Sequence, residues 1–113
     1  MNGSNQKAKE NIKKQYRINK KNMIELFGGK CSRCGFRDDI WALEFHHVNK
    51  NEKNHTPSNL MFLKDNNRLT SELDKCVMLC SNCHKSFEKS WSAIFVKSNF
   101  GYVISEFVTI EVA

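Results

Sequence analysis

The fold is decided by the stretch Leu43-Glu44-Phe45-His46-His47-Val48, read together with Cys80-Ser81-Asn82-Cys83-His84 further along the 113-residue chain. The first stretch alternates apolar and polar residues and ends in two histidines, a pattern typical of a half-buried strand. The second stretch joins a Cys-x-x-Cys pair directly to a further histidine. We therefore expect a strand and a metal-binding turn that the fold brings together.

Four of the five cysteines fit one structural zinc site. They form two Cys-x-x-Cys pairs, Cys31 with Cys34 and Cys80 with Cys83. Two thiolates three residues apart can reach one ion from a tight turn, and two such pairs complete a tetrahedral site. Disulfides and an iron–sulfur cluster are the alternatives. Cys76 lies outside the pattern, and we expect it to be a small buried apolar residue.

The N-terminal segment carries all of the excess positive charge. Residues 1–30 contain eight basic and two acidic residues, a balance of +6, whereas the rest of the chain contains ten of each. Apolar residues at helical spacing, ended by Gly28-Gly29, predict a helix over residues 7–27. A basic helix beside a neutral domain favours a polyanion such as DNA, with a solubilising tail as the alternative. The candidate contacts are Lys13, Lys14, Arg17, Lys20 and Lys21.

Short elements are predicted for the rest of the chain. If the first stretch is a regular strand, His46 and His47 point to opposite faces. A helix that continues from Ser81 or Asn82 to Trp91 would place His84 and Glu88 on one face. The expected elements are a strand at 41–48, a helix at 57–63, a helix beginning at 66 or 67, a strand at 77–79 that pairs with 42–47, a helix at 81–91 and a hairpin at 93–113.

These elements predict an α+β fold in three parts. They are a basic helical arm (1–30), a zinc-stabilised domain (31–91) and a C-terminal β-hairpin extension (92–113). A chain of this length buries a limited core, so a metal would contribute much of its stability. No apolar run approaches the roughly 18–20 residues of a membrane span, and no secretory signal is recognisable. We therefore expect a cytoplasmic protein with no membrane partner, in which cysteines favour metal over disulfides.

The residues between Cys31 and about Glu88, roughly half the chain, resemble the HNH (ββα-metal) endonucleases, most closely small phage and bacterial members. The resemblance rests on the first Cys-x-x-Cys pair, on Leu-Glu-Phe-His-His-Val, and on Glu-Leu-Asp-Lys-Cys-Val-Met-Leu-Cys-Ser-Asn-Cys-His. It implies a strand–strand–helix core with one divalent ion, Mg²⁺ or Mn²⁺. It also implies that His46 and His84 ligate this ion and that His47 is the general base.

Two positions depart from the family pattern. Many relatives have a second histidine where this chain has Glu88. A carboxylate also ligates Mg²⁺ or Mn²⁺, so Glu88 is a candidate third ligand. The asparagine of the family is replaced by Lys75, and Asn59 or Asn82 are the candidates to take over its role. Lys75 itself is a candidate phosphate contact, as is Lys85.

The resemblance implies metal-dependent hydrolysis of phosphodiester bonds in DNA, with double-stranded DNA expected first. The divalent ion would act as Lewis acid, and His47 would take a proton from water, since imidazole ordinarily titrates near pH 6.5. Two other interpretations stay open: a zinc-stabilised nucleic-acid-binding module without catalysis, and a protein-interaction domain on an HNH scaffold. The apolar hairpin also predicts a homodimer through edge strands. A bacterial or phage-infected cell is the expected setting.

Overall fold

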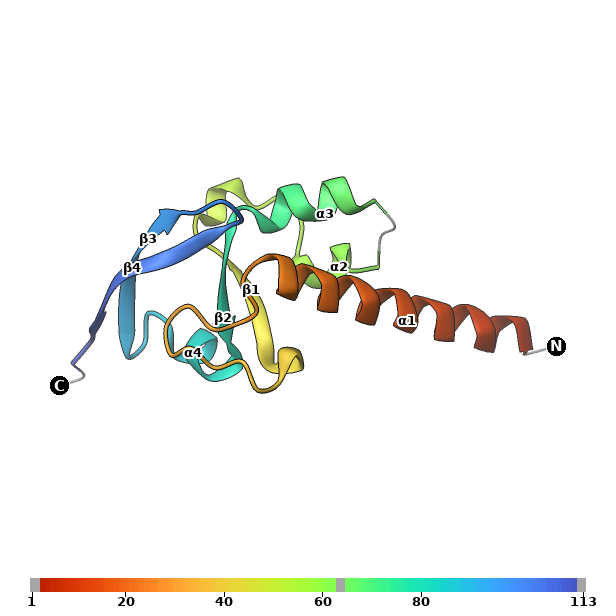
Figure 1. Cartoon of the computed structure of the whole chain (residues 1–113), viewed down its shortest axis with the longest axis horizontal. Coiled ribbons are helices and arrows are strands. Elements are labelled where there is room, and N and C mark those ends of the chain that lie inside the picture. The colour runs from red at the N-terminus through yellow and green to blue at the C-terminus, as the bar shows by residue number, and fades with distance from the viewer. Residues whose placement is uncertain (1–2, 63–64, 112–113) are drawn as a thin grey trace.

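The chain folds as an α+β structure around one four-stranded sheet (Figure 1). The computed structural model describes residues 3–62 and 65–111. The helices are α1 (Gly3–Leu26), α2 (Pro57–Leu60), α3 (Asn66–Leu73) and α4 (Ser81–Ser86), with 3-10 turns at Ile40–Ala42 and Lys50–Glu52. The strands are β1 (Leu43–His47), β2 (Cys76–Cys80), β3 (Trp91–Lys97) and β4 (Tyr102–Thr109), in the sheet order β1-β2-β4-β3. Within the described ranges, no helix has the length and apolar character needed to cross a membrane.

β1 and β2 pair antiparallel, which confirms the predicted partnership of these two strands. Every second residue of β1 is buried, so this strand has an inner and an outer face. His47 lies on the inner face and His46 on the outer face, as the alternation predicted. β2 lies between β1 and β4 and is buried along its whole length.

β1 begins later than the predicted strand of residues 41–48. The Asp39 side chain accepts a hydrogen bond from the backbone N–H of Trp41 at 3.0 Å and caps the turn Ile40–Ala42. Trp41 therefore lies outside the sheet, and 48% of its surface is exposed. An exposed tryptophan next to the first strand was not expected from the sequence.

α4 is shorter than predicted, because it ends at Ser86 and not at Trp91. The chain turns at Glu88, which has a φ of 67° and whose N–H donates to the Trp91 carbonyl at 2.7 Å. This turn carries Trp91 into the core, where it is fully buried and its indole N–H donates to the Cys83 carbonyl at 3.0 Å. Burial of the large ring favours the turn over a longer exposed helix. The prediction that Glu88 shares a helical face with His84 is therefore wrong.

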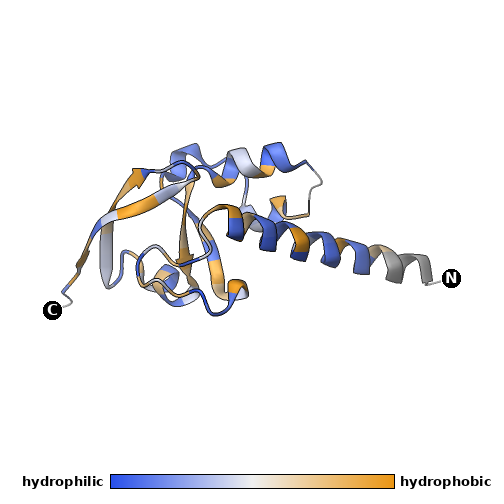
Figure 2. Ribbon diagram, in the orientation of Figure 1, coloured by the Kyte–Doolittle hydropathy of each residue, from blue (hydrophilic) through white to orange (hydrophobic). Residues whose placement is uncertain are grey.

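The predicted basic helix is α1, and its C-terminal half packs against the sheet domain. Met23 and Ile24 are buried, and the Asn19 side chain donates to the Met61 carbonyl at 2.7 Å. Residues 8–14 are exposed, including Ile12 with 52% of its surface, so the predicted apolar stripe is not covered along its whole length. α1 projects from the body as a largely hydrophilic helix (Figure 2), which gives the chain extents of 59 × 28 × 26 Å.

The two middle helices begin close to their predicted positions. Asp65 caps α3 by accepting the N–H groups of Asn67 and Arg68, and Leu69 and Leu73 point into the core as expected. α2 ends at Leu60, and the predicted end at Leu63 lies outside the described residues. α3 reaches the inner face of β1 through Glu72, which contacts His47.

β3 and β4 form the predicted C-terminal hairpin, which begins at Trp91 and not at residue 93. β4 joins β2 in parallel through Tyr102 and Val77. Gly101 has a φ of 73° in the connecting turn, and a Cβ there would stand 2.8 Å from the Cys76 carbonyl oxygen. Glycine is therefore required where the hairpin docks on β2. Several apolar side chains of the hairpin remain exposed: Ile94, Val96, Val103, Phe107 and Val108.

Candidate functional site

The four cysteines of the two Cys-x-x-Cys pairs meet at one point and could hold a metal ion such as zinc. The Sγ atoms of Cys31, Cys34, Cys80 and Cys83 all lie within 4.8 Å of one another. A zinc tetrahedron with bonds of about 2.3 Å has edges of about 3.8 Å, and the Sγ atoms of Cys34 and Cys80 are 3.8 Å apart. The donor set therefore fits the predicted site in both chemistry and dimensions.

Backbone and side-chain donors surround these sulfurs. The N–H of Cys34 points to the Cys31 sulfur at 3.5 Å, and the N–H of Cys83 points to the Cys80 sulfur at 3.4 Å. Burial raises the pKa of the Cys31 thiol, but hydrogen bonds from backbone N–H groups outweigh burial and lower the pKa to about 7. Arg33 donates to the Cys83 sulfur at 3.5 Å. Burial raises the pKa of Cys34, and it raises the pKa of Cys83 to about 12, so among these thiols the donors favour the thiolate form at Cys31.

Arg33 also joins the cysteine cluster to the C-terminal hairpin. Its guanidinium lies 4.7 Å from the ring centroid of Trp91 and 5.1 Å from that of Phe107. The hydroxyl of Ser32 accepts the N–H of Ile104 at 2.9 Å. The hairpin is therefore attached to the first Cys-x-x-Cys turn as well as to β2.

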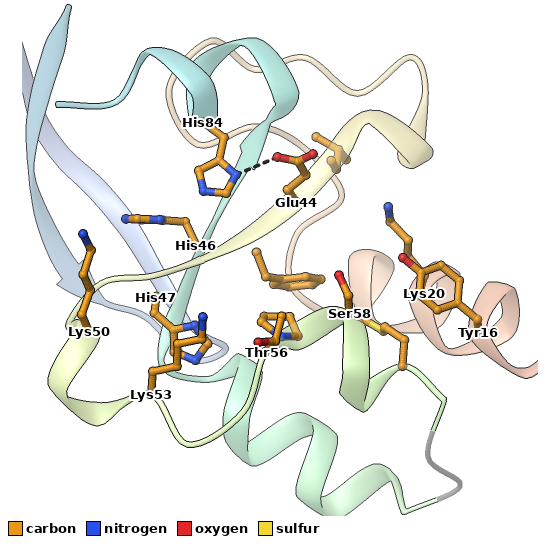
Figure 3. A pocket seen from close by; sticks show the side chains of 14 residues that line it. Tyr16, Lys20, Glu44, His46, His47, Lys50, Lys53, Thr56, Ser58 and His84 are labelled. Carbon is orange, nitrogen blue, oxygen red and sulfur yellow. Dashed lines mark hydrogen bonds and ion pairs between the residues drawn. The ribbon is translucent and has the colours of Figure 1, made fainter. Parts of the chain in front are cut away.

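His46 and His84 lie next to each other on the outer face of β1 (Figure 3), with ring centroids 5.0 Å apart. The Glu44 carboxylate is 2.7 Å from Nδ1 of His84 and also accepts the Ser81 hydroxyl at 3.2 Å. An ionised carboxylate accepts a proton held on Nδ1, which leaves the Nε2 lone pair of His84 for another partner. Glu44 is thus an orienting residue for His84.

The His46 ring is in the neutral form that binds metal ions. Burial, followed by the neighbouring His84, lowers the pKa of His46 to about 4, against an opposing contribution from Glu88. The ring is therefore neutral near pH 7, the form in which imidazole binds metals. Glu88 itself is exposed. Within residues 3–62 and 65–111, the four cysteines are the only group of three or more potential ligands close enough for one ion, so His46, His84 and Glu88 do not form such a group.

His47 lies on the other side of β1 and is held by a carboxylate from α3. Its Nε2 is 2.7 Å from Oε2 of Glu72, and both side chains are 5% exposed. The Glu72 carboxylate also accepts hydrogen bonds from the Lys75 ammonium at 3.0 Å and from the backbone N–H groups of Asn54 and His55 at 3.1 and 3.4 Å. Burial raises the pKa of Glu72, but these hydrogen bonds together lower it to about 2. The ionised carboxylate therefore accepts the Nε2 proton of His47, and Nδ1 is the ring nitrogen outside this hydrogen bond.

Lys75 holds the loop that follows His47. Its ammonium group donates to the Glu52 carbonyl at 3.0 Å as well as to Glu72, and its own carbonyl accepts the N–H of Val48 at 3.1 Å. Lys75, the position that departs from the HNH pattern, thus joins the start of β2 to the loop after β1. Asn59 and Asn82, the other candidates for that role, are exposed.

A groove of about 560 Å³, here called the β1 groove, runs along the free edge of β1. Both faces of β1 contribute to it, so His46, His84 and His47 line the same groove despite their opposite orientations (Figure 3). Three lysines contribute to its walls: Lys20, Lys50 and Lys53. Burial lowers the pKa of Lys20, which the nearby charges of Glu44 and Asp39 oppose.

The predicted nucleic-acid contacts are distributed unevenly. Lys20 lines the β1 groove, whereas Arg17 and Lys13 lie about one and two turns away along α1, in the groove that Trp41 also lines. Lys14, Lys21 and Lys85 are exposed and do not line either groove. The lysines of the loop after β1, Lys50 and Lys53, were not predicted, although their position directly after the histidine pair was a usable signal.

Two carboxylates were also missed. Glu72 lies three residues after Leu69 and one before Leu73, so it shares the apolar face of α3 and needs a buried partner. Glu44 lies two residues before His46 and shares its face of β1. Both positions were visible in the sequence, but their partners come from other elements.

No protein-family model matches the sequence, and neither a curated protein nor a solved structure matches the chain. The site is therefore interpreted from its own geometry.

Proposed function

We propose that this chain is a metal-dependent endonuclease or nickase that hydrolyses phosphodiester bonds in DNA, built on an HNH (ββα-metal) core and stabilised by structural zinc. The supporting observation is the buried pair of His47 and Glu72, which fixes one tautomer of a histidine beside a groove lined by two further histidines. The antiparallel pair β1 and β2, followed by α4, supports the proposal of a strand–strand–helix core.

His47 acts as the general base in this proposal. With Nε2 held by Glu72, the lone pair on Nδ1 accepts a proton from the attacking water, and the carboxylate stabilises the imidazolium that forms. Glu72 stays ionised because its pKa lies near 2. Lys50 and Lys53 bind phosphate oxygens on either side of the scissile bond.

His46 and His84 would hold the catalytic ion, and Glu88, whose charge acts on His46, is the candidate carboxylate ligand. Burial keeps the His46 ring neutral, and Glu44 occupies Nδ1 of His84, so Nε2 is the ring nitrogen of His84 left for the ion. When bound, the ion supplies Lewis acidity at the leaving oxygen. Two imidazoles favour Mn²⁺, Co²⁺ or Ni²⁺ over Mg²⁺, which prefers oxygen ligands.

Nicking of supercoiled plasmid across these four cations tests the proposal. His47→Gln keeps an amide that can bond to Glu72 but has no basic nitrogen, so nicking should fall by about 100-fold or more. His55→Ala is the matched control, because His55 contacts Glu72 only through its backbone N–H. Zinc content and circular dichroism confirm that each variant is folded. Parental nicking by His47→Gln would refute the assignment of the base.

A non-catalytic, zinc-stabilised nucleic-acid-binding module is the second candidate. The observation in its favour is that the cysteines alone, among the described side chains, assemble as a complete ligand set. Under this alternative the protein binds DNA in a salt-dependent way, but none of the four cations supports cleavage. A protein-interaction role instead predicts binding to a protein without affinity for DNA.

A further inference from the structure

A second groove, here called the aromatic cleft, lies between α1 and the segment before β1. Its volume is about 300 Å³, and it is lined by Lys13, Tyr16, Arg17, Trp41 and Phe62. Trp41 and Phe62 have 48% and 46% of their surfaces exposed. The cleft therefore presents aromatic rings to solvent between two cationic side chains.

The rings of the cleft are fixed in position. Tyr16 packs against Phe62 with ring centroids 5.1 Å apart. The backbone of Trp41 is held by Asp39, and Lys20 donates to the Trp41 carbonyl at 3.3 Å while its ammonium lies 5.8 Å from the indole centroid. These contacts restrict the orientations of the rings, and such restriction lowers the entropic cost of stacking.

The aromatic cleft adjoins the β1 groove. Tyr16 lines both, and Lys20 lines the β1 groove while touching Trp41. A chain of phosphates that passes His46 and Lys20 would therefore bring the adjacent nucleotide to the cleft. An aromatic face with flanking cations suits an unpaired base and its phosphate, whereas the bases of a duplex are already stacked on one another.

We propose that the aromatic cleft stacks an unpaired base next to the scissile phosphate, so that the substrate contains a single-stranded segment at this point. This proposal rests on the proposed nuclease function for the placement of the phosphate. It changes the expected substrate from a continuous duplex to DNA with a gap, an overhang or a single strand. A base on Trp41 would also set the register of the phosphate in the β1 groove.

Tryptophan fluorescence in buffer without added divalent cations tests the proposal, because it needs no cleavage. Trp41 is half exposed and Trp91 is fully buried, so a stacked base quenches mainly Trp41. The probes are a short thymidine oligonucleotide, a gapped duplex, a continuous duplex of the same length and an acidic peptide. The oligonucleotide and the gapped duplex should quench, and the continuous duplex and the peptide should not.

Substitutions of Trp41 separate stacking from charge. Trp41→Ala should weaken binding of gapped DNA by about 5- to 150-fold, the range expected for loss of one stacked base, with less effect on the continuous duplex. Trp41→Phe keeps a ring and should retain most of the affinity. Equal losses on gapped and continuous DNA, or equal quenching by the acidic peptide, would overturn the proposal.

The outcomes also separate this proposal from the nuclease function. Selective quenching by unpaired DNA, with no cation supporting cleavage of either plasmid or gapped DNA, would leave the cleft assigned and refute the nuclease. Efficient nicking of duplex plasmid that Trp41→Ala does not affect, together with no quenching by unpaired DNA, would support the nuclease function and refute the role of the cleft.

Discussion

Replacement of Glu72 with glutamine removes a charge from the carboxylate that holds His47. Glu72 accepts hydrogen bonds from the side chains of His47 and Lys75 and from two backbone N–H groups of the loop after β1. Glutamine has nearly the same shape, but it can accept through only one oxygen and carries no charge. The substitution therefore tests the carboxylate itself, without creating a cavity.

The expected loss of stability follows from the pKa of Glu72, which falls from its ordinary value of 4.5 to about 2. Each unit of such a difference corresponds to about 1.4 kcal/mol, so the ionised form stabilises the fold by about 3 kcal/mol relative to a neutral side chain. Because the pKa is lowered, this stabilisation is complete above about pH 4.5 and is lost as the pH falls towards 2. Glu72→Gln should therefore be less stable by about 3 kcal/mol at pH 7.

Urea unfolding at pH 7 with zinc present, followed by circular dichroism, measures this difference. Glu44→Gln is the matched control: Glu44 also lies 2.7 Å from a histidine, but its side chain is 41% exposed. Exposed pairs contribute at most about 1 kcal/mol. If the two variants lose the same stability, burial does not set the strength of the His47–Glu72 pair, and the reasoning fails.

The remaining predictions concern the zinc site and the hairpin. Removal of zinc by a strong chelator should unfold the chain, since a core this small depends on its metal; a native circular dichroism spectrum after release of one zinc per chain, measured with a colorimetric dye, would contradict this. The hairpin should mediate self-association through its exposed apolar side chains, so Val108→Lys, on a residue with 63% of its surface exposed, should lower the mass measured by light scattering. Ser105→Lys, at an exposed polar position on the same strand, should leave that mass unchanged, and a monomeric parent at every concentration would refute the dimer.

The local pattern of the sequence was sufficient to predict the strands and the cysteine cluster. Alternation around His46 and His47 gave the correct faces, because side chains of a strand alternate whatever surrounds it. The spacing within each Cys-x-x-Cys pair gave the cluster, because short spacing restricts the turn. Both features depend on residues close together in the chain.

Features that depend on distant partners were missed. The end of α4 is set by Trp91, which is drawn into a core that local helix propensity does not describe. His47 is paired with Glu72 of α3, and His84 is paired with Glu44 of β1. The spacing of these residues in the sequence fixes neither pair. Glu88 was placed by helical periodicity beyond the point where the helix ends. The roles of the predicted basic residues in binding stay predictions.

The projection of α1 makes the molecule an electric dipole. The excess charge of +6 belongs to residues 1–30, and most of this segment forms a helix that extends along the 59 Å axis away from a body of zero net charge. In the electric field of a polyanion such a molecule is oriented before contact, with the free end of α1 directed towards the polyanion. For the proposed complex with DNA, the helix end therefore makes the first contact, and the β1 groove reaches the DNA second, by rotation about that contact. Salt would then slow the encounter by weakening this orientation as well as the attraction itself.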